Sequence, residues 1–473
     1  MATSPHTLER PSVAIVGGGL SGLAGALAAT RRGFRVELFE ARKQLGGRAA
    51  SFRDPRTGAL VDYCQHVAMG CCTSLLDFCR RTGIADAFST HKVLHFIGPD
   101  GSQCDFRPSA FLPAPLHLVP ALLRLRFLTL RERWRIVRAL FQLARGVARA
   151  SEQTIGQWLR RHGQSERAIE RFWSVVLISA LSETVDRASL CAAQKVFVDG
   201  FLASRRAYEL LVPRVPLSDL LDCRVGTWLS EHGVAVRRGT SVRQIDGDSQ
   251  RATAVVLADG TRRPFDFIIV AVPWRQVRSL FPGPMLAAMP MLSGAEDLPP
   301  APITAVHLWF DRPITPLPHA VLVGRTSQWV FQGPGGRMLA EPEAKNAARL
   351  AADATSACAG RPPHYCQVVI SASHELVNRP RQQIIAEVRE DLESIWPAAR
   401  GAELLHCRVI THHAAVFSMR PGVDRLRPPQ QTPIANLLLA GDWTATGWPA
   451  TMESAVRSGY LAVEAIREKA ALA

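Results

Sequence analysis

The chain has 473 residues, which is long enough for two domains, and carries a formal net charge of +15 at pH 7. It contains no run of about 18 apolar residues and no apolar stretch before its first predicted strand, so we expect a cytoplasmic protein without a membrane-spanning helix or a cleaved signal peptide. The excess of basic side chains, almost all arginine, favours nucleic acid or an anionic membrane surface as a partner.

The first forty residues predict a βαβ unit. The β-branched run Ser12–Val16 has the composition of a buried strand and ends at three glycines. A helix of small residues is expected over Leu20–Arg32, stopped by Gly33, and a second strand over Phe34–Glu40. The succession of strand, glycine turn, helix and strand is typical of dinucleotide-binding proteins.

The glycines of this turn, Gly17-x-Gly19-x-x-Gly22, match the dinucleotide-binding fingerprint. Gly17 permits a tight turn, Gly19 lets a pyrophosphate approach the backbone, and Gly22 allows the helix to pack closely on the strand. The helix N-terminus offers free N–H groups to phosphate, and the Glu40 carboxylate can accept hydrogen bonds from ribose hydroxyls. A glycine-rich turn in an unrelated α/β fold is the alternative. The cofactor-binding residues predicted in this unit are Gly17, Gly19, Leu20, Ser21, Gly22, Glu40 and Ala41.

Two short segments after the βαβ unit also carry chemistry. Leu45–Arg48 (LGGR) places an arginine, which suits bidentate contact with phosphate, after a glycine pair; a basic surface turn is the alternative. Residues 61–79 contain Asp62, His66 and four closely spaced cysteines. The cysteine spacing matches no common zinc or iron–sulfur pattern, and a chain of this size needs no disulfide staples. We therefore expect buried, reduced thiols and no metal site.

Residues 112–149 form a basic and apolar segment. Leucines and aromatic residues alternate there with arginines, and Glu132 is the one acid between Leu116 and Arg149. Thr129 is expected to cap a helix. Such a helix fits the interface of an anionic membrane, whereas a solvated helical face is the alternative. No nucleic-acid recognition motif accompanies the charge, so we expect an anionic membrane and not nucleic acid as the partner.

The remaining elements alternate between helices and strands. A second helical block is expected from Ile155 to about Ser182, and residues 283–300, rich in Pro, Met and Gly, are predicted to form a loop. A meander with a turn at Asp259-Gly260 is expected from four strands, at Val234–Arg237, Ser241–Ile245, Thr253–Leu257 and Phe267–Val272. Further strands are expected at Ile303–Phe310, His319–Val323, Gln367–Ser371 and Leu437–Ala440, and helices at Gln382–Ile395 and Thr451–Ala471.

The segment Asn436–Trp443 (NLLLAGDW), followed by a helix near Thr451, resembles the final FAD-binding element of the amine oxidase and phytoene desaturase superfamily, and Leu45–Arg48 resembles its GGR element. The resemblance implies FAD as the cofactor, which the fingerprint alone does not distinguish from NAD. It also implies contacts from the GGR residues to the diphosphate, from Asp442 to the ribitol chain and from the Val242 backbone to adenine. The last helix would aim its N-terminus at the flavin. The cofactor-binding residues so implied are Gly46, Gly47, Arg48, Val242, Gly441, Asp442, Thr451 and Met452.

Within that superfamily, Val61–Cys72 (VDYCQHVAMGCC) and Gly441–Glu453 (GDWTATGWPATME) look like the squalene-associated FAD-dependent desaturases, also called hydroxysqualene dehydroxylases. This resemblance implies reductive removal of the hydroxyl group of hydroxysqualene to give squalene, on the way to hopanoids. It implies a Rossmann-like α/β FAD-binding domain with an interleaved α+β substrate domain and a helical membrane-facing segment. The expected division is FAD domain at 1–100, 226–280 and 416–473, helical segment at 101–225 and substrate domain at 281–415.

The implied reaction suggests catalytic residues. Loss of an allylic hydroxyl leaves a delocalised cation that a reduced flavin can quench with a hydride, which requires a dry, apolar pocket. Trp448 and Trp443 are candidates to stabilise the cation with their rings, with core packing as the alternative. His66 and Asp62 are candidates to assist departure of water, although His66 also fits a structural histidine and Asp62 also fits a residue that orients the backbone.

Three other functions remain open from the sequence. A carotenoid desaturase or isomerase would have the same fold and would act on a polyene. An amine oxidase would need aromatic residues around an amine, and Trp448 would supply half of such a cage. A flavin-bearing membrane scaffold would show no turnover with any isoprenoid.

Overall fold

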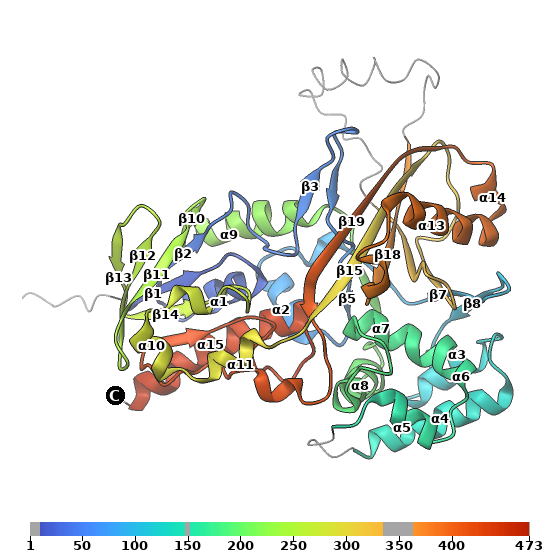
Figure 1. Ribbon diagram of the computed structural model, residues 1–473, viewed down its shortest axis with the longest axis horizontal. Coiled ribbons are helices and arrows are strands. Elements are labelled where there is room, and N and C mark those ends of the chain that lie inside the picture. Colours follow the sequence, from blue (N-terminus) through green and yellow to red (C-terminus); the bar gives the residue numbers. More distant parts are fainter. Residues whose placement is uncertain (1–9, 147–151, 334–362, 473) are drawn as a thin grey trace, which may run out of the picture.

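The computed structural model describes residues 10–146, 152–333 and 363–472 (Figure 1). At one end of the molecule lies a five-stranded parallel sheet with the strand order β10-β2-β1-β14-β20. Its strands come from both ends and the middle of the chain, at Ser12–Val16 (β1), Arg35–Glu40 (β2), Ala235–Arg238 (β10), Phe267–Val270 (β14) and Leu437–Leu439 (β20). The predicted α/β architecture is therefore present.

The central strand β1 has both faces covered. All five of its side chains are buried, and alternate residues enter different cores, Val13 and Ile15 on one face and Ala14 and Val16 on the other. On the first face, helices α1 (Leu20–Arg31) and α15 (Met452–Leu472) pack against each other. Gly459 of α15 permits this contact, because a Cβ there would lie 2.7 Å from the nitrogen of Gly25. The two ends of the chain are thereby joined.

A second, seven-stranded sheet stands beside the first and has the order β19-β15-β18-β17-β16-β7-β8 (Figure 1). All of its pairings are antiparallel except that between β16 and β7. Its strands are Leu94–Ile97 (β7), Gln103–Phe106 (β8), Pro300–Phe310 (β15), His319–Leu322 (β16), Trp329–Gln332 (β17), His364–Ser371 (β18) and Leu404–Phe417 (β19). Helices α13 (Arg381–Ile395) and α14 (Pro397–Arg400) cover one face of this sheet.

Three smaller sheets complete the strands. They consist of β11 (Val242–Gly247), β12 (Ala252–Leu257) and β13 (Arg262–Pro264); of β3 (Ser51–Arg53) and β4 (Leu60–Asp62); and of β5 (Ala68–Met69), β6 (Phe88–His91) and β9 (Leu210–Pro213). Helix α2 (Thr73–Arg81) lies against α15, and α9 (Val225–Glu231) precedes β10.

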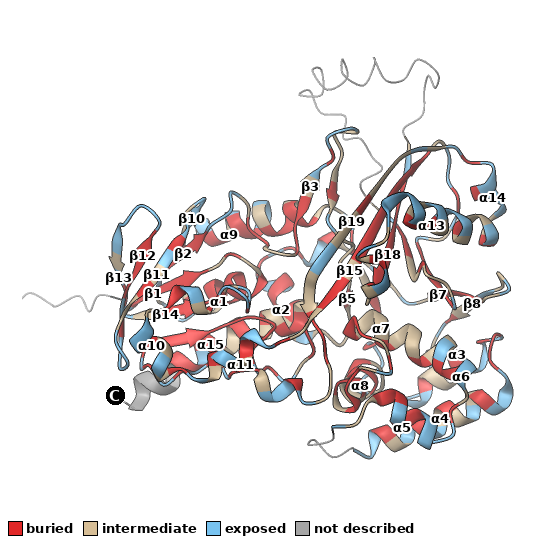
Figure 2. Cartoon of the chain, viewed as in Figure 1, coloured by how far each residue is buried: buried red, intermediate tan, exposed pale blue. Residues whose placement is uncertain are grey.

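The helical region between β8 and β9 lies below the second sheet in the view of Figure 1. It contains α3 (Val119–Leu123), α4 (Leu130–Ala144), α5 (Ile155–Arg161), α6 (Glu166–Ala168), α7 (Val175–Leu181) and α8 (Leu190–Phe197). Thr129 caps α4 as predicted, in a capping box with Glu132. Buried and exposed residues alternate along α4, as Figure 2 shows. In the part of the chain that the structure covers, no helix is both long and apolar enough to cross a membrane.

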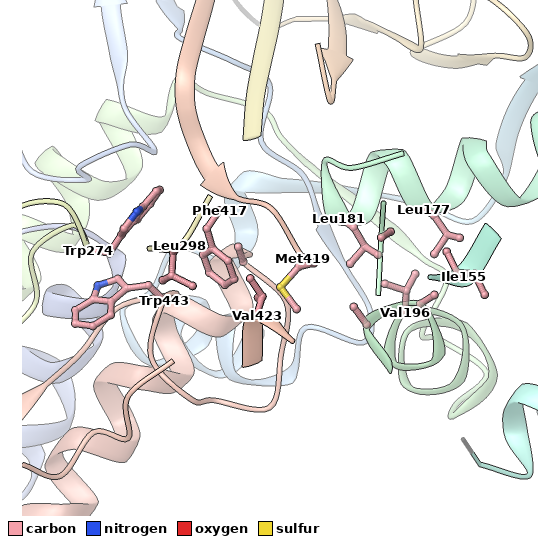
Figure 3. Packing of buried hydrophobic residues seen from close by; sticks show 14 of the residues in the cluster. Ile155, Leu177, Leu181, Val196, Trp274, Leu298, Phe417, Met419, Val423 and Trp443 are labelled. Atoms are coloured by element: carbon pink, nitrogen blue, oxygen red, sulfur yellow. The ribbon is translucent and has the colours of Figure 1, made fainter. Parts of the chain in front are cut away.

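One large apolar core connects these regions. Figure 3 shows buried side chains that run from Trp274 and Trp443, beside the parallel sheet, through Phe417 and Met419 to Leu177 in the helical region. The C-terminal loop and the helical region are therefore packed through a common interior.

Two predictions about secondary structure are wrong. Residues 283–300 are not a loop, because Gly283–Ala288 (α10) and Met291–Glu296 (α11) are helical. Met285 and Leu292 are buried, and this burial compensates for a composition that disfavours a helix. The four strands from Val234 to Val272 do not form one meander, because β10 and β14 pair in the parallel sheet and only β11, β12 and the unpredicted β13 form an antiparallel ladder. The helical block predicted from Ile155 to about Ser182 is confirmed, and it is divided after Arg161.

Candidate functional site

A cavity of about 970 Å³ runs from the βαβ turn into the helical region. Its two halves differ in chemistry. One half is lined by glycines and polar groups, among them Gly17, Gly19, Glu40 and Asp442. The other half is lined by aliphatic and aromatic side chains, among them Phe96, Leu122, Val137, Phe172 and Val176. The cavity is near the upper end of the size range typical of ligand pockets.

The three fingerprint glycines are required for different reasons. Gly17 has a φ of +111°, and an added Cβ would lie 2.5 Å from the carbonyl oxygen of Ala271. At Gly22 an added Cβ would overlap the carbonyl oxygen of Gly17. Gly19, by contrast, has an ordinary φ of −75°, and the nearest atom to an added Cβ is the Gly47 Cα at 4.0 Å. Protein packing therefore leaves free the space that a side chain at Gly19 would occupy, as expected if a ligand lies there.

Glu40 ends β2 at the cavity wall. One of its carboxylate oxygens accepts a hydrogen bond from the Gly18 N–H at 2.7 Å, and the other accepts from the Arg42 N–H at 2.8 Å. These two contacts fix the carboxylate, while its remaining lone pairs are available to ribose hydroxyls. Ala41 also lines the cavity.

The GGR segment and the C-terminal Gly-Asp segment meet at the cavity. Gly46 donates its N–H to the Gly18 carbonyl oxygen, so the GGR turn lies against the fingerprint. The Arg48 guanidinium donates to the Asp442 carboxylate at 2.6 Å and to the Ala415 carbonyl oxygen at 2.8 Å. Asp442 is almost fully buried and Arg48 is one-third exposed. Two motifs nearly 400 residues apart thus form one ion pair on the cavity wall.

Two helix N-termini also line the cavity. Gly19 caps α1 without a side-chain hydrogen bond, and Leu20 and Ser21 follow it on the cavity wall. At α15, Thr451, Met452 and Glu453 line the cavity. Both helices present positive dipole ends to a ligand with negative charge. Val242, after β10, lines the same half.

The loop around Asp442 is held by residues that the sequence did not single out. The buried Arg427 donates to the carbonyl oxygens of Asp442 and Thr444. Glu453 is fully buried, and its carboxylate accepts from the N–H groups of Ser74 and Leu75 at the start of α2. A lone basic residue before the final strand carries no motif, so only the fold reveals the role of Arg427.

His66 lines the cavity, and its hydrogen bond determines its tautomer. Its Nδ1 lies 2.8 Å from the carbonyl oxygen of Cys64. Because a carbonyl only accepts, Nδ1 carries a proton, and the other ring nitrogen of a neutral imidazole is then an acceptor. Burial lowers the pKa of His66, and the charges of Arg48 and His412 lower it further. The ring is therefore neutral at pH 7.

Asp62 does not line the cavity. Its carboxylate accepts hydrogen bonds from the Ser51 hydroxyl at 2.6 Å and the Leu217 N–H at 2.8 Å, so it fixes backbone behind the cavity wall. Burial raises its pKa to about 6, although these two hydrogen bonds lower it. Gly22 also stands outside the lining, in its packing position against Gly17.

Trp448 lines the cavity close to the N-terminus of α15. The ammonium group of Lys195, from α8, lies over its ring, 5.0 Å from the centroid. Trp443 also lines the cavity but is fully buried, and its indole N–H donates to the Val272 carbonyl oxygen. No group of three or more potential metal ligands occurs among the residues that the structure describes, and the described cysteines form no disulfide with one another.

The apolar half of the cavity reaches the surface at the basic segment. Leu116 and Phe141 both line the cavity and are 54% and 57% exposed. Phe111 and Trp134 are exposed nearby in the sequence, at 94% and 68%. Glu132 is paired with Arg167, so this acid does not neutralise the exposed Arg131 and Arg138 of α4.

Comparisons with known proteins identify the fold and the cofactor. A family model described as flavin containing amine oxidoreductase matches residues 20–467. A hydroxysqualene dehydroxylase of Rhodopseudomonas palustris is 27% identical, over 96% of this chain and 98% of the relative. A 15-cis-phytoene desaturase of Solanum lycopersicum is 24% identical, over 98% of this chain and 79% of the relative. An oxidoreductase structure from Methanosarcina mazei has a TM-score of 0.69 at 17% identity, covering 97% of this chain and 100% of that one.

The predicted superfamily, fold class and cofactor are therefore confirmed, and the cofactor is FAD. The residues present fit a dinucleotide, because the open space at Gly19, the fixed Glu40 carboxylate and the two helix N-termini line one half of one cavity.

Proposed function

We propose that this chain, which belongs to the family of flavin-containing amine oxidoreductases, removes the hydroxyl group of hydroxysqualene to give squalene. The chain is an FAD-dependent oxidoreductase of the phytoene desaturase group. The finer assignment rests on one structural observation, the long apolar half of the cavity beside the cofactor half, and on the similarity to hydroxysqualene dehydroxylases.

The apolar half suits a long hydrocarbon chain. Its lining comes from α3, α4, α7, α8 and the second sheet and consists almost entirely of aliphatic and aromatic side chains. A C30 isoprenoid has one hydroxyl group, so its binding energy must come from burial of methyl and methylene groups, at about 0.8 kcal/mol per CH₂. Such a lining supplies that burial.

The residues of the chain prepare the reaction by enclosure and orientation. When reduced, FAD supplies the hydride that replaces the hydroxyl group. The apolar walls exclude water, which would otherwise add to the allylic cation and form the alcohol again. In our proposal the ring of Trp448 stabilises positive charge on that carbon. His66, being neutral with a proton on Nδ1, serves as an acceptor on the cavity wall and not as an acid.

The charge of the cavity disfavours an amine as the substrate. Lys195 is the one charged residue among the lining residues of the described helical region, and it places a positive charge on Trp448. No carboxylate from the described residues of 101–225 lines the cavity, so an ammonium substrate would find no counter-ion on this part of the wall. A carotenoid desaturase activity is the stronger alternative, because the phytoene desaturase relatives are similar over the same length and a polyene would also fit an apolar cavity.

We also propose that the cavity receives its substrate from the membrane. Two exposed apolar residues of 111–141, Leu116 and Phe141, line the cavity, and the exposed Arg131 and Arg138 lie in the same segment. A helix of this composition binds at the interface of an anionic bilayer. The protein would then be cytoplasmic and peripheral on the inner face of the membrane.

The function is tested by single turnover. Photoreduced enzyme is mixed anaerobically with hydroxysqualene, and we expect squalene to form as the flavin reoxidises. Deuterium placed at flavin N5 should appear on the carbon that lost the hydroxyl group, provided that it exchanges slowly with solvent. Phytoene is offered to oxidised enzyme in parallel. Growth of polyene absorbance there, with no squalene in the first reaction, would replace the dehydroxylase proposal by a desaturase.

A further inference from the structure

Lys195 is placed in the apolar half of the cavity by the local fold. It lies on α8, whose neighbouring residues Val196 and Phe197 line the same wall, and its side chain is one-third exposed. No other charged side chain from the described residues of 101–225 lines the cavity. A single charge in an apolar wall is costly unless it has partners.

The partners of Lys195 engage only two of the three N–H donors of its ammonium group. The ammonium group pairs with the Asp199 carboxylate, one helical turn later, at 2.5 Å. It also lies over the ring of Trp448, 5.0 Å from the centroid. An ammonium group has three N–H donors, so after one is given to Asp199 and one is directed to the ring, a third remains.

Two other polar groups of the cavity wall do not compete with Lys195 as donors to a substrate. The Ser179 hydroxyl donates to the Val175 carbonyl oxygen and accepts from the indole N–H of Trp329. His66 offers an acceptor and no donor at its second nitrogen. Lys195 is thus the charged donor of the substrate half, and Trp448 connects it to the N-terminus of α15 in the cofactor half.

We propose that Lys195 binds the hydroxyl group of the substrate, and that the Lys195–Trp448 pair makes the cavity select a long-chain allylic alcohol over the matching hydrocarbon. This inference rests on the proposed function and adds the recognition of the polar group. The hydrogen bond fixes the position of the C–O bond within an otherwise apolar chain. As that bond breaks, a proton from the ammonium group lets the oxygen leave as water, and a hydride from reduced FAD would take its place on the carbon. The product lacks the hydroxyl group, so the same pair also favours product release.

The test compares binding of an alcohol and a hydrocarbon. Oxidised holoenzyme, which has no hydride to donate, is titrated in detergent micelles with hydroxysqualene or squalene, and dissociation constants are obtained from quenching of protein fluorescence. The variants are Lys195→Met, which keeps the length and removes the charge, and Lys195→Gln, which keeps an N–H donor. Lys92→Met, at an exposed lysine outside the cavity, is the matched control. FAD content shows that each variant is folded.

We expect Lys195→Met to weaken hydroxysqualene binding by about 10- to 100-fold, the range for a hydrogen bond to a charged group, while squalene binding changes little. Lys195→Gln should fall between, and Lys92→Met should match the wild type. If Lys195→Met retains FAD and the alcohol preference of the wild type, the role of Lys195 is refuted and the proposed function stands. If the wild type binds neither compound, the proposed function fails and this inference fails with it.

Discussion

Gly19 has no side chain, although its backbone conformation and the surrounding protein atoms would both allow one. The φ of −75° is accessible to any residue, and no protein atom comes closer than 4.0 Å to an added Cβ. Gly17 and Gly22 differ, because a side chain at either would collide with the protein itself. The fingerprint therefore combines two folding requirements with one binding requirement, and only Gly19 tests the second.

We predict that Gly19→Val leaves the protein folded and abolishes FAD binding, because the added methyl groups would occupy the position of the pyrophosphate. FAD content and circular dichroism measure the two effects. Gly401→Val is the matched control, since Gly401 is exposed, has a negative φ and has no atom within 4 Å of an added Cβ. A yellow Gly19→Val protein with full FAD occupancy would contradict the assignment of the fingerprint.

The ion pair between Arg48 and Asp442 gives a second prediction at this scale. Asp442→Ala removes a buried carboxylate that we expect to accept a hydrogen bond from the cofactor, and it releases Arg48. We expect the FAD dissociation constant to rise by a factor that corresponds to about 1.5–3 kcal/mol. Arg48→Met and the double variant complete a mutant cycle. The loss of FAD binding free energy in the double variant should be smaller than the sum of the losses in the two single variants. An unchanged FAD affinity in Asp442→Ala would make Asp442 a turn residue only.

At the scale of elements, the basic helix α4 is held in place by its one acid. Glu132 belongs to the capping box with Thr129 and also accepts hydrogen bonds from Ser165 and Arg167. Burial alone would raise its pKa, but the hydrogen bonds from Arg167, Ser165 and Thr129 outweigh burial and lower the pKa from 4.5 to about 2. The N-terminus of α4 is thus docked through a carboxylate.

We predict that Glu132→Gln lowers the free energy of unfolding at pH 7 by about 1–3 kcal/mol. Because the folded pKa is depressed, the contribution of the carboxylate is complete above the ordinary pKa of 4.5 and disappears as the pH falls toward 2. The difference in unfolding free energy between wild type and Glu132→Gln, measured with urea, should therefore shrink over that interval. Glu390→Gln, at an exposed position of α13, should be neutral at every pH. A difference that is independent of pH would point to packing instead.

The same helix provides the prediction for the membrane. Purified protein should bind anionic liposomes, and binding should weaken as salt rises. The triple change Arg131→Glu, Arg135→Glu and Arg138→Glu should abolish most of this binding in a flotation assay. The control reverses three exposed arginines outside the segment, Arg243, Arg251 and Arg381, with the same change in net charge. Equal loss in both variants would mean that net charge, and not α4, determines binding. Absence of binding for the wild type at low salt would exclude the membrane role.

On the scale of the whole molecule, the cofactor half of the cavity is built by segments remote in the sequence. Residues of α1, of the GGR turn, of the Gly-Asp loop and of α15 line it together, and α1 packs directly against α15. A ligand that touches all of them stabilises both ends of the chain at once.

We predict that FAD slows amide hydrogen exchange of apoprotein at both ends together, in residues 17–23 and in 441–455, while α13 on the outer face of the second sheet is unaffected. Exchange followed by mass spectrometry measures all three regions in one sample, so α13 is an internal control. Protection of the N-terminal segment alone would mean that the Gly-Asp loop does not contact the cofactor.

The sequence by itself determined the local elements and the cofactor chemistry. The βαβ unit, the capped α4, the GGR turn and the Gly-Asp element are each specified by residues within a few positions of one another, because turn glycines, caps and strand composition act locally. The residues predicted to bind the cofactor, from Gly17 to Met452, line the cavity with the exception of Gly22, and their contacts with FAD stay a prediction.

Only the tertiary structure decided which of these residues meet. The Arg48–Asp442 pair, the contact of Lys195 with Trp448 and the support of the Asp442 loop by Arg427 each join segments distant in the sequence. The helices at residues 283–296 and the partition of β10 and β14 from their neighbouring strands also depended on burial by remote segments. Non-local contacts are chosen by how the whole chain buries its apolar surface, and no single stretch of sequence contains that information.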